Sequence, residues 1–484
     1  MHRLALLLLP LLFVACSLDA RAQQARPTET PPPIAREFRG AWVATVDNID
    51  FPSRPGLSAQ ELAAELDAIV TRAAELRLNA LLFQVRPAGD AFYRSSLEPW
   101  SAWLTGTQGK APDADFDPLA HLIERCHGQG IQLHAWFNPF RCWHKASKGK
   151  PHSTHVTQKA PQLVVQHGPY QWLDPGLPLA HKWSLATVQE VLRHYDVDGI
   201  HVDDYFYPYA EGREFADGGS FTKYRQGGGR LDRAAWRRQN VDSYVQALYQ
   251  LVHSEKPWVQ VGISPFGIAR PGVPKGIEAG VDQFVELAAD VPKWLREGWL
   301  DYLAPQLYWP IDQRAQSFPV LLEYWRAQNQ HGRAIWAGLP TYRILAKEAG
   351  FRISELRDEL ALTRSSSTAG HVHYSFKALR GDAPHVAGCL RELYAELALP
   401  PAMPWLDTQS PRPPVVRVDK RAKATTVSWQ TDANARFVVV QARRASGWRT
   451  VHITAAGRGQ CELGPDVDKV VVSAVGRNGL VVPQ

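Results

Sequence analysis

The sequence is poor in cysteine and has no runs of basic residues. The 5 cysteines of the 484 residues include Cys126, Cys142, Cys389 and Cys461, which are widely separated and lack the close spacing of a zinc site. We therefore expect neither a metal nor a cofactor. Cys126 and Cys142 could form a disulfide in an oxidising compartment, and buried free thiols are at least as good an alternative. The net charge of +6 comes from scattered basic residues, which argues against nucleic-acid binding.

Long apolar runs are also scarce, which excludes a polytopic membrane protein. The run Leu4 to Val14 is too short to span a membrane and follows His2-Arg3, so it predicts an export signal over residues 1–22. Phe13-Val-Ala-Cys16 resembles a lipoprotein cleavage site in which Cys16 would carry lipid, whereas Ala20-Arg-Ala22 offers an ordinary cleavage site. Residues 23–36, rich in Pro, Thr and Gln, then form a solvated tether. We expect an exported protein that contacts a membrane only through a possible lipid on Cys16.

Aromatic residues are abundant, with 17 Trp, 15 Tyr and 17 Phe. Aromatic rings in loops suit stacking on sugar rings, and tryptophans also fill cores, so the sequence leaves both uses open. The rest of the composition, 45% hydrophobic and 21% charged, is ordinary for a globular protein of one large and one smaller domain. The sequence does not specify an oligomeric state.

Short apolar strands alternate with amphipathic helical stretches from residue 37 to residue 399, which predicts an α/β fold with a parallel sheet wrapped by helices. The expected strands are Gly40 to Val46, Ala80 to Arg86, Gln132 to Asn138, Gly199 to Asp204, Val259 to Ser264, Tyr302 to Tyr308, Ala334 to Leu339 and His371 to Phe376. The expected helices are Ser58 to Leu76 with a capping box at Ser58 and Glu61, Asp117 to Gln129, Leu185 to His194, Arg233 to Ser254, Asp282 to Glu297, Val320 to Gln330 and Ile353 to Thr363. Eight strands close a TIM-type (β/α)8 barrel.

Polar and aromatic residues gather near the carboxyl ends of the expected strands, where the loops of such a barrel form the active site. They are Gln84, Arg86, His134, Trp136, Asn138, Asp203, Asp204, Ser264, Gln306, Tyr308 and Ser375. Gln84 and Ser264 could equally be structural hydrogen-bonding residues. The polar residues nevertheless lie at the same end of six strands, which favours a common site.

The segment from Asp198 to Tyr209 is the most informative one. A short apolar strand runs into Asp203 and Asp204 and then into a series of aromatic residues, a pattern typical of a sugar-cleaving site. Strand alternation places Asp203 on the face that points to the barrel mouth, and Asp204 would need a bulge or the start of a loop to join it. The alternative is a helix cap or an arginine partner, which two adjacent aspartates beside three tyrosines make less favourable.

The composition changes after Leu399. Residues 400–414 form a Pro-rich linker, and residues 415–484 show short alternating strands that predict a small all-β sandwich with Trp429 in its core. Because no aromatic cluster lies on an exposed strand, we favour a spacer or brace over a sugar-binding module. The expected strands are Thr425 to Trp429, Arg436 to Ala442, Trp448 to Ile453 and Lys469 to Ala474.

The chain resembles the bacterial glycosyl-hydrolase-like family ten. The matching segments are Phe38 to Trp42, Phe83 to Asp90, Ala135 to Pro139, Trp172 to Gly176, Asp198 to Tyr209, Gly262 to Gly267 and Ala304 to Trp309. The resemblance implies a TIM-type barrel, glycosidase activity and periplasmic or outer-membrane placement, and an envelope lipoprotein of that family acts on the glycan strands of peptidoglycan. The C-terminal sandwich resembles a fibronectin type III module.

Two carboxyl groups normally serve in glycoside hydrolysis, so we expect Asp203 as the primary catalytic carboxylate, Asp204 as its partner and Asp90 as a reserve acid. The strand also aligns loosely with the acidic run of chitinases, but His201 and Tyr205 replace two of its acids, which leaves the proton donor open. A catalytically silent glycan-binding lipoprotein and a hydrolase of a secreted exopolysaccharide are the alternative functions.

The remaining candidate residues bind the glycan. Arg86 and Arg141 could bind a lactyl carboxylate or neutralise the aspartates. Asn138 and Gln306 suit sugar hydroxyls, and Tyr308 suits an acetamido group or a charged intermediate. Stacking surfaces are expected from Trp136, Tyr205, Tyr207 and Trp309.

Overall fold

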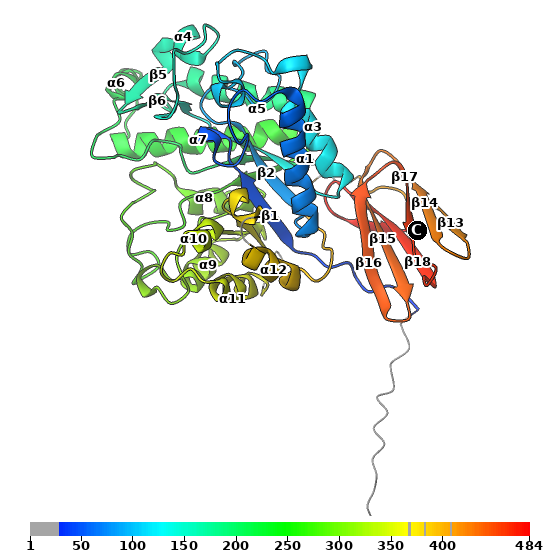
Figure 1. Cartoon of the computed structure of the whole chain (residues 1–484). Coiled ribbons are helices and arrows are strands. Elements are labelled where there is room, and N and C mark those ends of the chain that lie inside the picture. The colour runs from blue at the N-terminus through cyan, green and yellow to red at the C-terminus, as the bar shows by residue number, and fades with distance from the viewer. Residues whose placement is uncertain (1–28, 366–368, 382–383, 407–408) are drawn as a thin grey trace, which may run out of the picture.

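The computed structural model describes residues 29–365, 369–381, 384–406 and 409–484. The signal peptide 1–22 and Cys16 lie outside the described residues. Among the described residues, no helix is long and apolar enough to cross a membrane. Figure 1 shows two units, a large α/β body and a smaller all-β unit beside it.

The large body is a closed parallel barrel, as predicted. Its strands are β1 (Phe38–Val43), β2 (Ala80–Arg86), β3 (Gln132–Phe137), β7 (Gly199–Val202), β8 (Gln260–Ile263), β9 (Tyr302–Leu303), β10 (Ala334–Ile335), β11 (Ala337–Leu339) and β12 (Gly370–His373). The hydrogen-bonded order runs β10-β9-β8-β7-β3-β2-β1-β12-β11. Because β10 and β11 are the two parts of one strand interrupted at Trp336, nine strands fill eight positions and the ring closes.

Alternation along each strand separates two apolar regions. Leu81, Phe83 and Val85 of β2 pack outward against the helices. Ala80 and Leu82 point into the barrel, where they pack with rings such as that of Trp336. The barrel interior is therefore a filled core, and the space for a ligand lies above it.

The helices cover the outside of the barrel. They are α1 (Ala59–Glu75), α2 (Ala102–Thr105), α3 (Pro118–Gly128), α4 (Val156–Lys159), α5 (Pro178–His194), α6 (Gly218–Gln226), α7 (Arg233–Glu255), α8 (Val291–Arg296), α9 (Phe318–Ala327), α10 (Thr341–Leu345), α11 (Ile353–Thr363) and α12 (Pro384–Leu393). The capping box predicted at Ser58 is confirmed, since Ser58 accepts from the Glu61 backbone N–H and Glu61 accepts from the Ser58 backbone N–H. A small sheet of β4 (Arg141–Trp143), β5 (Val164–His167) and β6 (Tyr170–Leu173) was not expected.

The helix predicted from Asp282 to Glu297 is wrong in its first half. Only α8 is helical, and Asp290 caps it by accepting from the Lys293 backbone N–H. Ala288 has a φ of 54°, a left-handed conformation that an α-helix excludes. The Gln283 side chain donates to the backbone of Phe266 and Ile268, so this stretch is bound to the loop that follows β8.

The C-terminal unit is a β-sandwich of two antiparallel sheets. One contains β13 (Val415–Lys420), β14 (Thr425–Gln430) and β17 (Arg458–Leu463), and the other β16 (Gly447–Ala455), β15 (Ala435–Arg444), β18 (Lys469–Gly476) and β19 (Val481–Pro483). Trp429 is 4% exposed and lies in the core between the sheets, as predicted. The cysteines of the described chain are all unpaired, so Cys126 and Cys142 are buried thiols and not a disulfide.

The sandwich packs on the amino-terminal pole of the barrel (Figure 1). The Arg436 guanidinium, 7% exposed, donates to the Asp198 carboxylate at 2.6 Å and to the Asp196 carboxylate at 2.8 Å. Asp198 immediately precedes β7, so this contact lies at the end of the barrel opposite the strand carboxyl ends. The Trp405 indole in the Pro-rich segment also donates to buried Asp301 at 2.8 Å. The two units are thereby joined by buried polar contacts.

Candidate active site

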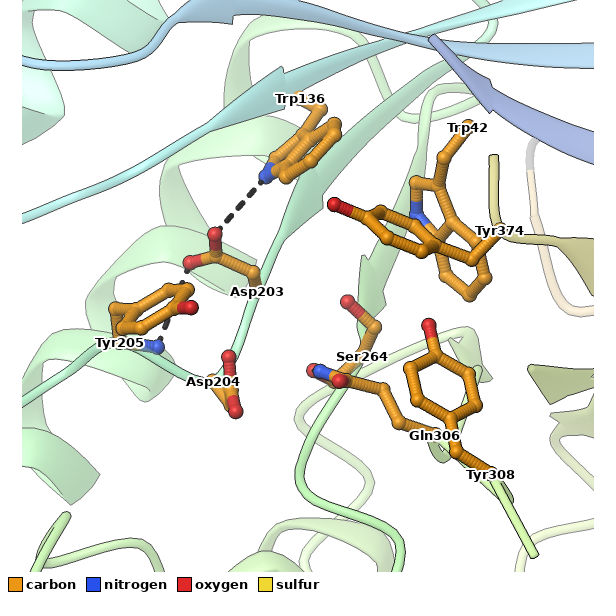
Figure 2. Close-up of a pocket in the computed structure, with 9 residues that line it drawn as sticks. All are labelled: Trp42, Trp136, Asp203, Asp204, Tyr205, Ser264, Gln306, Tyr308 and Tyr374. Atoms are coloured by element: carbon orange, nitrogen blue, oxygen red, sulfur yellow. Dashed lines mark hydrogen bonds between the residues drawn. The ribbon is translucent and has the colours of Figure 1, made fainter. Parts of the chain in front are cut away.

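A cavity of about 230 Å³ opens at the carboxyl end of the barrel strands. Its lining consists of five aromatic residues and four polar ones: Trp42, Trp136, Tyr205, Tyr308, Tyr374, Asp203, Asp204, Ser264 and Gln306. Figure 2 shows the two aspartates on one side and Ser264, Gln306 and Tyr308 on the other. The volume lies just below the roughly 300–1,000 Å³ of typical ligand pockets, which suits a single sugar ring.

Asp203 follows directly on β7, which ends at Val202, and the residue is 3% exposed. The Oδ2 atom accepts from the Asn138 side-chain amide and from Trp136 Nε1, the latter at 3.3 Å (Figure 2). The Oδ1 atom accepts only a long bond of 3.4 Å from the Tyr205 backbone N–H. Oδ1 is therefore the oxygen best able to carry a proton.

Asn138 is itself held in place by Gln84. The Gln84 Nε2 atom donates to Asn138 Oδ1 at 2.6 Å, while Gln84 Oε1 accepts from the backbone N–H groups of Thr45 and Val46 at 2.9 Å each. Gln84 and Asn138 do not line the cavity. They connect β1, β2 and β3 to the Asp203 carboxylate and fix its orientation.

Asp204 also reaches the cavity, because β7 ends before it and the chain enters a loop, as the sequence required. Its Oδ2 atom accepts from the Tyr209 hydroxyl at 2.5 Å. The Gln306 side chain points toward Asp204 across the cavity (Figure 2) and donates to the Ser264 carbonyl oxygen at 3.0 Å.

The two aspartates hold a proton near neutral pH. Burial and then the charge of Asp204 raise the pKa of Asp203 to about 7, while Arg141 opposes the shift. Burial also raises the pKa of Asp204, and the Tyr209 hydrogen bond opposes that rise. A carboxyl group that is partly protonated at neutral pH, next to a second carboxyl group, can supply the acid that glycoside hydrolysis needs.

A buried histidine supports the cavity floor. His201 Nε2 lies 3.1 Å from Trp42 Nε1 and 3.0 Å from the Ser264 hydroxyl, and its Nδ1 lies 3.0 Å from the Tyr302 hydroxyl. Burial holds the pKa of His201 well below its usual value, so the ring is neutral. His201 thus positions Trp42 and Ser264, and it does not line the cavity itself.

Five other candidates lie outside this cavity. Arg86 is fully buried, with its guanidinium 2.6 and 2.7 Å from the Glu98 carboxylate oxygens. Asp90 is buried in the loop after β2, where burial raises its pKa to about 6. Tyr207 packs in the outer core, and Trp309 packs edge-on against Phe266 at 5.6 Å between ring centroids. Arg141 lies in an adjoining cavity described below.

Two lining residues were missed from the sequence, Trp42 and Tyr374. Trp42 lies near the carboxyl end of β1, and Tyr374 follows the last residue of β12. Both residues could have been identified by the criterion used for the others, which is a position near the carboxyl end of a barrel strand.

The family model described as Glycosyl hydrolase-like 10 matches residues 37–350, more than half of the chain. The chain belongs to this family. Among its relatives, the glycosyl hydrolase YngK of Bacillus subtilis is 37% identical over 396 residues, 78% of this chain and 76% of the relative. The glycosyl hydrolase DigH of Escherichia coli K12 is 32% identical over 369 residues, 70% of this chain and 82% of the relative.

A solved structure supports the fold of this glycosyl hydrolase-like 10 protein. The glycoside hydrolase domain of PgaB from Bordetella bronchiseptica aligns with a TM-score of 0.50 and 15% identity, over 74% of this chain and 99% of that domain. At this identity the likeness speaks for the fold alone. Together with the family membership and the glycosyl hydrolases related to it in sequence, the TIM-type barrel makes the protein a glycosidase.

Proposed function

We propose that this glycosidase hydrolyses an amino-sugar polysaccharide, the glycan strands of peptidoglycan, with Asp203 and Asp204 as its catalytic carboxyl groups. The observation that carries the proposal is the pair of buried, adjacent carboxyl groups at the carboxyl end of β7, inside a cup of aromatic rings. Both features match what cleavage of a glycosidic bond requires.

In the proposed reaction Asp203 is the proton donor. A pKa of about 7 keeps its carboxyl group partly protonated at neutral pH, so that Oδ1 can protonate the leaving oxygen. Asp204, held by the Tyr209 hydroxyl, acts as the carboxylate that stabilises the positive charge developing on the sugar ring. Water finally adds to the ring carbon and gives its proton to Asp203, which restores the acid. If the sugar's own acetamido oxygen attacks the ring carbon, Asp204 and the Gln306 amide are placed to orient that group.

The lining also suits an amino sugar. Trp42, Trp136 and Tyr374 offer apolar ring faces for the sugar plane, and Ser264 and Gln306 offer hydrogen bonds for its polar substituents. An acetamido group needs both a donor and an acceptor, which a side-chain amide such as that of Gln306 supplies.

The experiment is incubation of the purified protein with peptide-free peptidoglycan strands, with chito-oligosaccharides and with a partly deacetylated glucosamine polymer, followed by mass spectrometry of the products. We expect shortened products from the peptidoglycan strands. Cleavage of the glucosamine polymers alone would favour an exopolysaccharide as the substrate and contradict the proposal.

The role of the aspartates is tested with Asp203→Asn and with Asp90→Asn as its matched control. Asp90 is also buried and also has a raised pKa, but it lies outside the cavity. We expect Asp203→Asn to lose turnover by roughly 10²- to 10⁴-fold while it still binds strands, and Asp90→Asn to keep turnover. Loss of turnover in Asp90→Asn alone would transfer the acid role to Asp90, and an inactive wild type that binds strands would indicate a silent binding protein.

We further propose export to the cell envelope with lipid on Cys16. A mass increase of the mature protein that disappears in Cys16→Ser would support the anchor, and a mature N-terminus after Ala22 would contradict it.

A further inference from the structure

A second cavity, of about 150 Å³, adjoins the catalytic one and shares Tyr205 with it. Its lining consists of Arg141, His144, His167, Tyr170, Trp172, Tyr205, Pro208, Tyr209 and Glu211. The residues come from the small sheet β4-β6-β5 and from the loop after β7. Because Tyr209 also donates to Asp204, the second cavity lies next to the catalytic pair.

Arg141 is the principal charged group in this cavity. It is only 5% exposed, and its Nε atom donates to the Pro87 carbonyl oxygen at 3.0 Å. The guanidinium carbon lies 5.1 Å from the centre of the Tyr205 ring. Within the described part of the chain, no carboxylate oxygen lies within 4.0 Å of the Arg141 nitrogens, and the two terminal NH2 groups have no hydrogen-bonded protein partner.

A comparison with Arg86 shows that a buried arginine of this protein can have all its guanidinium nitrogens paired, which Arg141 does not. Arg86 is equally buried, but its guanidinium is fully used by Glu98 and by two backbone carbonyl oxygens. Among the described residues Arg141 makes no direct ion pair, and the Asp203 and Asp204 carboxyl groups act on it only over a longer distance. A buried guanidinium whose terminal NH2 groups have no direct partner is suited to an anionic ligand. Among the residues that line the second cavity, Glu211 is the only acid, and it is exposed at the rim.

The surroundings of Arg141 leave it the strongest anion-binding group there. Burial and the charge of Arg141 lower the pKa of His144 to about 3, so that ring is neutral. His167 donates through Nε2 to the Tyr209 carbonyl oxygen at 2.9 Å, and its buried Nδ1 has no partner in the described chain. An acceptor of this kind suits a hydroxyl group beside the anion.

We propose that Arg141 binds a carboxylate on the sugar unit next to the one held in the catalytic cavity, so that the enzyme selects acidic glycans. The inference rests on the proposed function, since it requires a glycan in the catalytic cavity. A planar guanidinium with two free NH2 groups can hold a carboxylate by two parallel hydrogen bonds. In a peptidoglycan strand this carboxylate is the lactyl group of a muramic residue, and in other acidic glycans it is that of a uronate.

The test compares substrates that differ only in charge. Peptide-free peptidoglycan oligosaccharides are used with the lactyl carboxylate free or converted to its methylamide, and an oligosaccharide of alternating glucuronate and N-acetylglucosamine represents the uronate source. Both kcat/KM and the dissociation constant are measured for the wild type, Arg141→Gln and Arg141→Lys. Lys145→Gln is the control, because Lys145 is exposed and lies four residues away on the same segment.

We expect the wild type to prefer the free carboxylate over the methylamide by about 10- to 100-fold, the range of a charge-assisted hydrogen-bonded pair. Arg141→Gln should reduce this ratio to about 1, Arg141→Lys should restore part of it, and Lys145→Gln should leave it within about 2-fold. Preference for the uronate oligosaccharide over the muramic one would still support Arg141 as the carboxylate-binding residue, and it would identify a uronate as the source of the carboxylate.

An unchanged ratio in correctly folded Arg141→Gln, checked by circular dichroism, would overturn the proposal and leave Arg141 as a group that only neutralises the aspartates. Failure of the proposed function would look different, because the wild type would cleave neither form. The dissociation constants of the charged and methylamide forms would still report whether Arg141 recognises the carboxylate.

Discussion

The sharing of a proton by the two active-site aspartates is tested most directly by Asp204→Asn. The pKa of Asp203 rises from 3.8 to about 7, with burial as the largest cause and the charge of Asp204 as the next. Each unit by which the Asp204 charge raises the pKa of Asp203 corresponds to about 1.4 kcal/mol. The amide keeps the size of the side chain and removes the charge.

The expected result is a shift in the pH dependence of kcat/KM. Because Asp203 must be protonated to act as the acid, wild-type activity should fall as the pH rises through about 7. Without the Asp204 charge the pKa of Asp203 falls, so this alkaline limb should move down by roughly 1 unit. The maximum rate should also fall by about 10²- to 10³-fold, because the charge on the sugar ring loses its stabilising carboxylate.

The assay is kcat/KM for a strand oligosaccharide between pH 4 and pH 9, with Asp203→Asn and Asp90→Asn measured beside Asp204→Asn. Asp203→Asn should lack the alkaline limb, and Asp90→Asn should keep the wild-type profile. An alkaline limb that stays in place or moves up in Asp204→Asn would refute the assignment of the proton to Asp203.

Three other substitutions have defined outcomes. Tyr209→Phe removes the 2.5 Å hydrogen bond that lowers the pKa of Asp204. The acid limb of the pH profile of kcat/KM should therefore move to higher pH by roughly 1 unit. An acid limb that does not move would contradict a catalytic role for the Asp204 charge. Arg86→Met leaves a buried glutamate without its partner and should lower the free energy of unfolding by about 3–5 kcal/mol in urea titrations; a loss of activity without a loss of stability would instead place Arg86 in substrate binding. Arg436→Met should lower the free energy of unfolding by a similar amount at pH 7. This loss should become smaller at acid pH, because the depressed pKa of Asp198 stabilises the folded protein fully only above the ordinary carboxyl pKa. A loss of stability that does not depend on pH would exclude this ion pair as its source.

The barrel could be predicted from the sequence because short apolar strands alternate with amphipathic helical stretches along the chain. A strand is present at each of the eight predicted positions, and β2 matches residue for residue, but β9 ends at Leu303 and β12 at His373, before the predicted ends at Tyr308 and Phe376. The first half of the predicted helix 282–297 failed because the backbone of Ala288 is left-handed and Gln283 binds a neighbouring loop, neither of which a hydrophobic period can reveal.

The candidate site was predictable to the extent that it follows the strand ends. Asp203, Asp204, Trp136, Ser264, Gln306 and Tyr308 lie together as the barrel geometry required. Arg86 shows the limit of this reasoning, because its partner Glu98 lies in an irregular loop 12 residues later, where sequence periodicity carries no information. A polar residue at a strand end can therefore face either a ligand or a buried counter-ion, and only the tertiary contact distinguishes the two.

The path of the first described residues determines which end of the enzyme lies nearest to its N-terminal side. Glu29 forms ion pairs with Arg443 and Lys469 of the sandwich, the Pro32 carbonyl oxygen accepts from Gln441, and Arg36 donates to Pro400 and Gly479. The chain therefore enters β1 from the side of the barrel on which the sandwich lies (Figure 1), whereas the catalytic cavity lies at the carboxyl ends of the strands. The residues that precede Glu29 therefore join the described part of the molecule beside the sandwich, at the opposite end of the barrel from the catalytic cavity.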